Sequence, residues 1–177
     1  ITPSVLNYQF QHFKKFESKR NLIVSGAKSF ASLGDKITKK FDQEKINYEV
    51  KILENYQSTV EYASSMASSL KEYENIICIG SGSVVDICKF ISNQNNQGLF
   101  VYLSSLSAAA TTSTVYLTKN GIKVSIKSKI PEDITIDLYN LKIAHTRILR
   151  SAIVDALCRQ PCRAEWLISC FVCVWFM

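Results

Sequence analysis

The chain has 177 residues, of which 47% are hydrophobic and 20% are charged, and its formal net charge is +6. This composition is typical of a globular protein with a buried core and argues against a disordered chain. A basic surface could attract nucleic acid or an anionic substrate, but the lysines are scattered and no aromatic and basic module of an RNA binder is visible. We therefore expect a solvated lysine surface and no nucleic-acid partner.

The start of the sequence and the cysteines predict a cytoplasmic protein with free thiols. The sequence starts at Ile1 without a positively charged and apolar leader, which predicts a cytoplasmic protein. Cys78 and Cys88 fall within apolar patterns, as expected of free buried thiols. The apolar stretch 167–177 is about half as long as a membrane span, so no membrane association is predicted.

Short apolar or alternating runs predict four strands, at 21–25, 48–53, 75–79 and 99–103. Between them, apolar residues recur every three or four positions and predict helices over 27–44, 58–70 and 83–93. Ser58 and Ser83 are the expected caps of the second and third helices. This alternation is typical of an α/β fold with a Rossmann-like parallel sheet and flanking helices, whose ligands bind at the carboxyl ends of the strands.

The pattern changes after the fourth strand. Residues 114–117 and 122–126 flank Asn120-Gly121, a pair that readily adopts the positive φ angles of a tight turn, and so predict a β-hairpin. A further short strand is predicted at 134–137.

A glycine turn joins the third strand to the helix that follows it. Gly80, Ser81, Gly82 and Ser83 end the apolar run, and Asp86 comes three residues later, as in the first turn of a helix. Small residues at a helix N-terminus expose backbone N–H groups on which a phosphate can sit. On spacing alone, a plain tight turn without a ligand is an equal alternative.

The segment Gly80 to Lys89, GSGSVVDICK, resembles the GGGSxxDxxK segment of the superfamily of iron-containing alcohol dehydrogenases, glycerol dehydrogenases and 3-dehydroquinate synthases. The resemblance spans about residues 21 to 158 and is greatest to the glycerol-1-phosphate dehydrogenase branch. It implies that Gly80, Ser81, Gly82, Ser83 and Asp86 bind the pyrophosphate region of NAD or NADP.

Two other strand ends offer candidate residues. Ser25 ends the first predicted strand and is a candidate cofactor contact, although plain turn chemistry explains it equally well. After the fourth strand, 104–113 resembles the family loop SvPTaaShDG, which implies that the Ser107 hydroxyl lies near the cofactor. Leu106, Ala110 and Thr112 replace the family's proline, serine and substrate-side aspartate, so normal substrate handling is not implied.

The resemblance also implies a divalent metal, zinc or iron, in the intact enzyme. Asp155 matches the aspartate of the family's aGxxD segment, whereas neither histidine of the chain, His12 or His145, falls where a ligand is expected. Because a catalytic divalent ion needs about three protein ligands, we do not expect the complete metal site in this chain.

These observations predict a nucleotide-binding α/β domain at 1–146 and, at 147–177, the start of a truncated helical domain with an atypical hydrophobic tail. We expect that a truncation or frame shift leaves the helical C-terminal domain largely missing. The implied function is an NAD(P)-dependent, metal-dependent oxidoreductase that acts on an alcohol, polyol or glycerol phosphate, with this fragment itself inactive. The alternatives are a 3-dehydroquinate synthase-like cyclase, which is a carbon-oxygen lyase, and a non-catalytic nucleotide-binding module; a homo-oligomer is left open.

Overall fold

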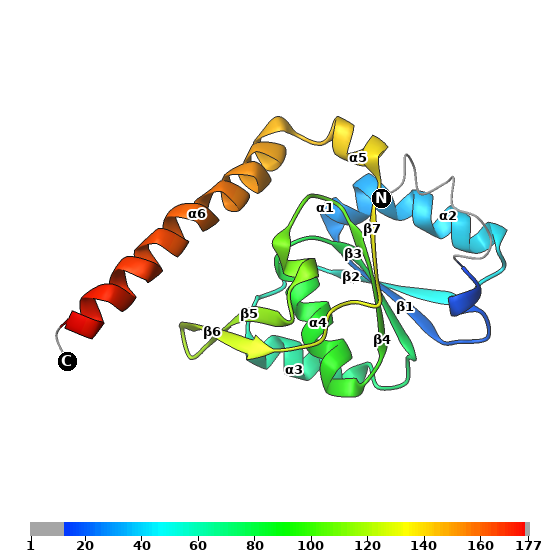
Figure 1. The fold of residues 1–177 in the computed structure, drawn as a ribbon. Coiled ribbons are helices and arrows are strands. Elements are labelled where there is room, and N and C mark those ends of the chain that lie inside the picture. Colours follow the sequence, from blue (N-terminus) through cyan, green and yellow to red (C-terminus); the bar gives the residue numbers. More distant parts are fainter. Residues whose placement is uncertain (1–12, 176–177) are drawn as a thin grey trace. The chain divides into compact units, whose positions relative to one another are not determined.

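The computed structural model describes residues 13–175, apart from the side chains of Ala108 and residues 173–175. It divides into a first unit that ends at Ile143 and a second that begins at Ala144. The first unit is an α/β structure built on five parallel strands in the order β2-β1-β3-β4-β7 (Figure 1). This confirms the expected Rossmann-like sheet. Its strands are β1 Asn21–Gly26, β2 Tyr48–Leu53, β3 Asn75–Gly80, β4 Gly98–Leu103 and β7 Asp133–Ile136.

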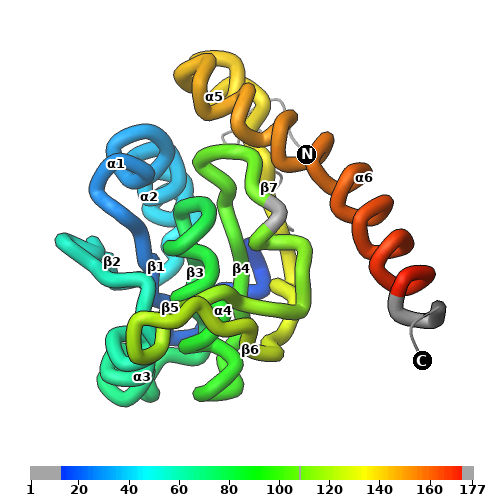
Figure 2. Tube along the Cα trace, turned by 90° about the vertical axis from the view of Figure 1, so that its left-hand side faces the viewer, coloured from blue at the N-terminus to red at the C-terminus, as the bar shows by residue number. Residues whose placement is uncertain are grey.

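Helices cover both faces of this sheet, and Figure 2 shows α3, α4 and the hairpin in front of it. The helices of the first unit are α1 Ala27–Ser29, α2 Asp35–Gln43, α3 Val60–Ser69, α4 Ser83–Asn95 and α5 Leu138–Ile143. One hydrophobic core lies between the sheet and α3 and α4, and it includes residues of β5. The second core lies on the face covered by α2 and holds Phe13, Phe16 and Phe41. Because β1 and β3 are central, their side chains are buried on both faces.

The first helical segment differs from the single helix predicted at 27–44. A π-helical turn, Phe30–Gly34, separates α1 from α2. A Cβ atom added at Gly34 would lie 2.4 Å from the ring of Phe30, so the glycine makes room for that ring inside the turn.

Both predicted helix caps are wrong by one residue. Thr59 caps α3, because its Oγ1 accepts a hydrogen bond from the Tyr62 amide at 3.2 Å. Ser58 instead accepts the Thr118 amide at its main-chain carbonyl, at 2.8 Å, and so links this segment to the hairpin. Gly82 is the N-cap of α4, without a side-chain cap, and Ser83 is the first helical residue.

The predicted hairpin is present as β5 Thr114–Lys119 paired antiparallel with β6 Ile122–Lys127. Asn120 and Gly121 have φ angles of 50° and 78°, which are the positive values that a two-residue turn of this kind requires. The hairpin begins where the loop after β4 ends.

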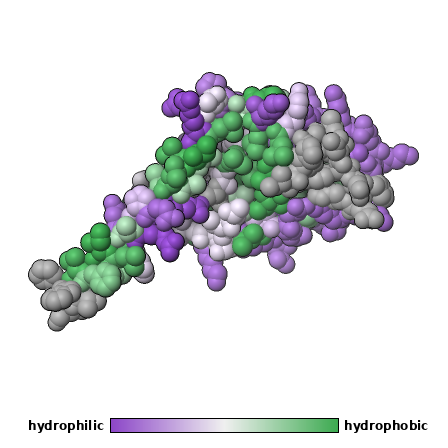
Figure 3. All heavy atoms as spheres, turned by 45° about the horizontal axis from the view of Figure 1, so that its top comes forward, coloured by the Kyte–Doolittle hydropathy of each residue, from purple (hydrophilic) through white to green (hydrophobic). Residues whose placement is uncertain are grey.

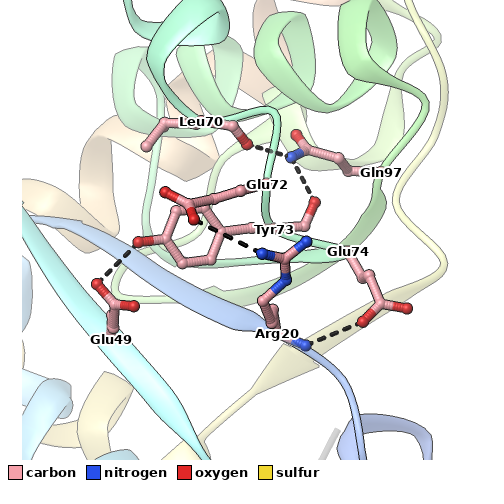
Figure 4. Close-up of polar contacts among 7 residues, drawn as sticks. All are labelled: Arg20, Glu49, Leu70, Glu72, Tyr73, Glu74 and Gln97. Atoms are coloured by element: carbon pink, nitrogen blue, oxygen red, sulfur yellow. Dashed lines mark hydrogen bonds and ion pairs between the residues drawn. The ribbon is translucent and has the colours of Figure 1, made fainter.

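Polar side chains form hydrogen bonds and an ion pair at the amino ends of the strands (Figure 4). The Tyr73 hydroxyl donates to Glu49 Oε2 at 2.8 Å, and this hydrogen bond raises the pKa of Tyr73 to about 12. Arg20 lies 3.6 Å from Glu72, and the Gln97 side-chain amide donates to the carbonyls of Leu70 and Tyr73. Side-chain contacts therefore link the segments at the amino ends of the strands.

Two buried asparagines stand at the start of the two central strands. In the register of β1 with β3, Asn21 is opposite Asn75, and Asn75 Nδ2 donates to Asn21 Oδ1 at 2.9 Å. Asn21 Nδ2 in turn lies within 3.0 Å of the carbonyls of Phe16 and Asn47. The two carboxamides thus connect β1, β3 and the segments before β1 and β2.

The second unit is one helix, α6 Thr146–Trp175, which contains Pro161. Figure 3 shows hydrophobic side chains along α6 with hydrophilic ones between them. Its exposed large apolar residues are Ile148, Ile153, Val154, Leu157, Trp166, Leu167, Ile168, Phe171 and Val172. Across residues 13–175, every helix is too short or too polar to cross a membrane.

Candidate functional site

The glycine turn lies at the carboxyl end of β3, where the chain enters α4. Gly82 adopts φ 48° and ψ −119°, a combination that favours glycine, and a Cβ atom added there would meet no atom within 4 Å. The first turn of α4 is closed by hydrogen bonds from the Val84 amide to the Ser81 carbonyl and from the Asp86 amide to the Gly82 carbonyl. The turn therefore presents open backbone at the positive end of a 13-residue helix.

The loop after β4 brings serine hydroxyls to this turn. Ser105 Oγ donates to Ser81 Oγ at 2.8 Å, and Ser107 Oγ accepts the Gly82 amide at 3.3 Å. Ser107 also accepts the Ala109 amide at 3.3 Å and so caps the 3₁₀ helix Ala108–Thr111. The predicted residues Ser81, Gly82 and Ser107 thus meet, and the Gly82 amide already has a long hydrogen bond to a side chain.

A hollow of about 570 Å³ adjoins the turn, a volume within the range of ligand sites in proteins. It lies at the carboxyl ends of β1 and β2, where parallel sheets bind ligands. Lys28 adds a positive charge to it and Glu54, exposed just after β2, a negative one. The residues that line it are Gly26, Ala27, Lys28, Ser29, Leu53, Glu54, Asn55, Tyr56, Ser81 and Val84.

Ser25 does not reach this hollow. Its side chain is fully buried, and its hydroxyl donates to the Ile79 carbonyl of the neighbouring strand at 2.7 Å. The structure therefore gives Ser25 a role in joining β1 to β3, and it is the next residue, Gly26, that lines the hollow. Glycine in that position leaves the backbone open to a ligand.

Asp86 is buried on the side of α4 that faces the hairpin. Its carboxylate accepts a hydrogen bond from the Tyr116 amide of β5, and its Oδ1 has no partner among the described residues. Burial raises the pKa of Asp86 from 3.8 to about 6, while the positive charges of Lys89 and Lys123 oppose that shift. Asp86 thus faces β5, whereas Ser83 stays exposed at the turn.

Two residues of this region were missed from the sequence. Sequence patterns do not single out Ser105 in a loop with several hydroxyls, although its place just beyond the carboxyl end of β4 could have indicated it. Lys89 is fully buried, and its ammonium contacts the loop that carries Ser107. Lys89 is the last residue of the segment that resembles GGGSxxDxxK, and this was the available signal.

The residues present do not fit a divalent metal. Asp155 lies on α6 in the second unit, and the side chains that the structure describes include no group of three or more His, Cys, Asp or Glu residues that could hold an ion. His145 is exposed, and its Nδ1 accepts the Arg147 amide at 3.2 Å. Asp155 alone cannot replace the missing ligands.

Comparisons with known proteins identify relatives of this chain. A family model for iron-containing alcohol dehydrogenases matches residues 1–144. A glycerol-1-phosphate dehydrogenase from Saccharolobus islandicus, named for NAD(P)+, is 25% identical over 151 residues, which are 84% of this chain and 42% of that protein. The chain thus spans less than half the length of this curated relative.

Solved structures share the fold. A glycerol dehydrogenase from Schizosaccharomyces pombe superposes with a TM-score of 0.70 at 22% identity, over 84% of this chain and 39% of that one. An iron-containing alcohol dehydrogenase from Thermotoga maritima gives a TM-score of 0.74 at 17% identity, over 89% and 52% of the two chains. Since the family model covers most of the sequence, the resemblance stated from the glycine turn is confirmed: the chain belongs to the iron-containing alcohol dehydrogenase family.

Proposed function

We propose that this chain binds NAD or NADP and is the nucleotide-binding part of an oxidoreductase that acts on a polyol or glycerol phosphate. The observation that carries the proposal is the open Gly82 backbone at the start of α4, with the hollow of about 570 Å³ beside it. A pyrophosphate at the turn would meet the open Gly82 backbone and the helix dipole, with Ser81 and Ser83 offering hydroxyls. The adenosine half would extend toward Gly26 and Glu54.

The substrate and the metal of this proposal depend on family membership and on the name of a relative. The name of the Saccharolobus relative supports glycerol phosphate as the substrate, and family membership supports alcohol oxidation. Hydride would pass between the bound cofactor and the alcohol carbon. Because the donor set around Asp155 does not fit a divalent ion, we expect nucleotide binding without turnover from this chain alone. That observation also favours the second candidate, a non-catalytic nucleotide-binding module.

The first prediction concerns Gly82. Calorimetric titration of the 177-residue chain with NAD, NADP and ADP is expected to show binding, and Gly82→Val is expected to weaken it at least tenfold. The added side chain would project into the open space where the phosphates approach, and β-branched residues disfavour a positive φ.

Gly121→Val is the matched control for this substitution. Gly121 also has a positive φ and open space around its Cα, but it lies at the tip of the hairpin. We expect the Gly121→Val chain to bind as the wild type does. No heat with any of the three nucleotides, or equal affinity of Gly82→Val and wild type, would refute the proposed site.

The second prediction concerns the choice of cofactor. A carboxylate near the adenosine ribose accepts the 2′-hydroxyl of NAD and repels the 2′-phosphate of NADP. Since Glu54 lines the hollow, we expect Glu54→Lys to change the ratio of the dissociation constants for NADP and NAD at least tenfold in favour of NADP. Glu17→Lys makes the same change of charge at an exposed residue before β1 and is expected to keep the wild-type ratio. Equal ratios in all three chains would place the ribose elsewhere.

A further inference from the structure

Lys89 is a lysine without access to solvent in the middle of α4. Its Nζ donates to the main-chain carbonyls of Ala109 at 2.8 Å, Thr112 at 2.5 Å and Thr114 at 2.9 Å, and lies 3.3 Å from Thr112 Oγ1. All four acceptors are uncharged oxygen atoms from one continuous segment. That segment runs from the 3₁₀ helix after β4 to the first residue of β5.

Burial of this cation is unfavourable in itself. Desolvation lowers the pKa of Lys89, and the charge of Asp86 opposes the shift. A buried ammonium persists only when its hydrogen bonds are satisfied, and here each proton of Nζ has a carbonyl to meet. An apolar side chain of the same length would fill the space without this requirement. The ammonium therefore selects one conformation of the segment that supplies the carbonyls.

The first part of the same loop contacts the glycine turn. Ser105 contacts Ser81, and Ser107 accepts the Gly82 amide. Since α4 begins at that turn and carries Lys89 two turns further along, the helix holds both ends of the loop. We infer that Lys89 is a positioning residue, which fixes the loop 104–113 so that the Ser105 and Ser107 hydroxyls stay over the glycine turn. The effect of Lys89 on nucleotide affinity rests on the proposed function, whereas its effect on the loop does not.

Lys89→Met and Lys129→Met, compared with the wild-type chain, test this role. Methionine keeps the length and loses the charge. Lys129 is the matched control, since its Nζ also donates to a buried carbonyl, that of Gln97, and burial also lowers its pKa. Gln97 lies just before β4, at the amino ends of the strands, whereas the glycine turn lies at the carboxyl end of β3.

Hydrogen exchange followed by mass spectrometry is the main measurement. For Lys89→Met we expect exchange in peptides covering 104–113 to become at least tenfold faster, with β1 and β3 unchanged, and the affinity for NAD to fall at least fivefold. Lys129→Met is expected to leave the loop and the affinity as they are. Wild-type exchange in the loop of Lys89→Met, or equally faster exchange in loop and strands, would overturn the inference.

A second variant serves if Lys89→Met does not fold. Thr112→Val removes the hydroxyl that approaches Lys89 and donates to the Thr114 carbonyl at 2.9 Å, at a residue that is not fully buried. We expect about twofold to fivefold faster exchange confined to the loop, and unchanged exchange there would count against the inference. If the wild type binds no nucleotide, the proposed function fails, while the exchange data still decide the role of Lys89.

Discussion

Gly80→Ala is expected to lower the free energy of unfolding by about 1–3 kcal/mol, the range seen when a well-packed interior is overfilled. A Cβ atom on Gly80 would lie 2.8 Å from both Cβ and Cγ1 of Val84. Those atoms belong to the first turn of α4, so the helix can yield only by moving away from β3. Urea denaturation of wild type and variant measures the difference.

Gly26→Ala is the control for this prediction. Gly26 also ends a central strand and also faces Val84, but its added Cβ would come no closer than 3.6 Å. Its φ of −79° suits alanine, so we expect a change within about 0.5 kcal/mol of wild type. Equal stability of the two glycine variants would show that α4 is not held against β3 as described.

Asp86→Asn is expected to remove a pH dependence of stability between about pH 4 and pH 6. The pKa of Asp86 is raised from 3.8 to about 6 by burial, so in this window the folded chain holds a proton that the unfolded chain has lost. The Asp86 contribution to stability therefore falls as pH rises through the window and stays low above pH 6. At pH 7.5 we expect the asparagine variant to be more stable by about 2 kcal/mol.

Urea denaturation at pH 4.0, 5.0, 6.0 and 7.5 measures this effect as a difference between the two chains. Other carboxylates titrate in the same range, but they are common to both and cancel. Asp35→Asn removes the same charge at an exposed position and is the control for loss of a carboxylate. A constant difference between Asp86→Asn and wild type at all four pH values would contradict the prediction.

Local patterns were enough to predict the architecture of the first unit. The uniformly apolar run Asn75–Gly80 becomes a central strand because both of its faces are covered, and Asn120-Gly121 closes the hairpin because both residues accept a positive φ. The π-helical turn could not be predicted in this way. It depends on how the ring of Phe30 packs against Gly34, which helical periodicity does not encode.

The site was predictable only where backbone conformation defines it. Gly82 was found because a small residue between a strand and a helix is visible in sequence. Ser25 was offered as a cofactor contact because it ends a strand, and the structure turns its hydroxyl into the sheet toward Ile79. Lys89 was missed because its partners are carbonyls of residues 20 to 25 positions away, and main-chain acceptors leave no mark on sequence.

The asparagine pair at the head of β1 and β3 has a consequence for how the sheet assembles. Both strands are apolar on both faces, so an alignment shifted by one residue would still bury hydrocarbon against hydrocarbon. Such a slip would place Asn21 beside Ile76 and leave Asn21 Oδ1 and Asn75 Nδ2 desolvated and without their hydrogen bond, at about 1–3 kcal/mol for each group. Asn21 and Asn75 thus favour the native register of β1 with β3 over registers shifted by one residue. The apolar side chains of the two strands alone would not distinguish these registers.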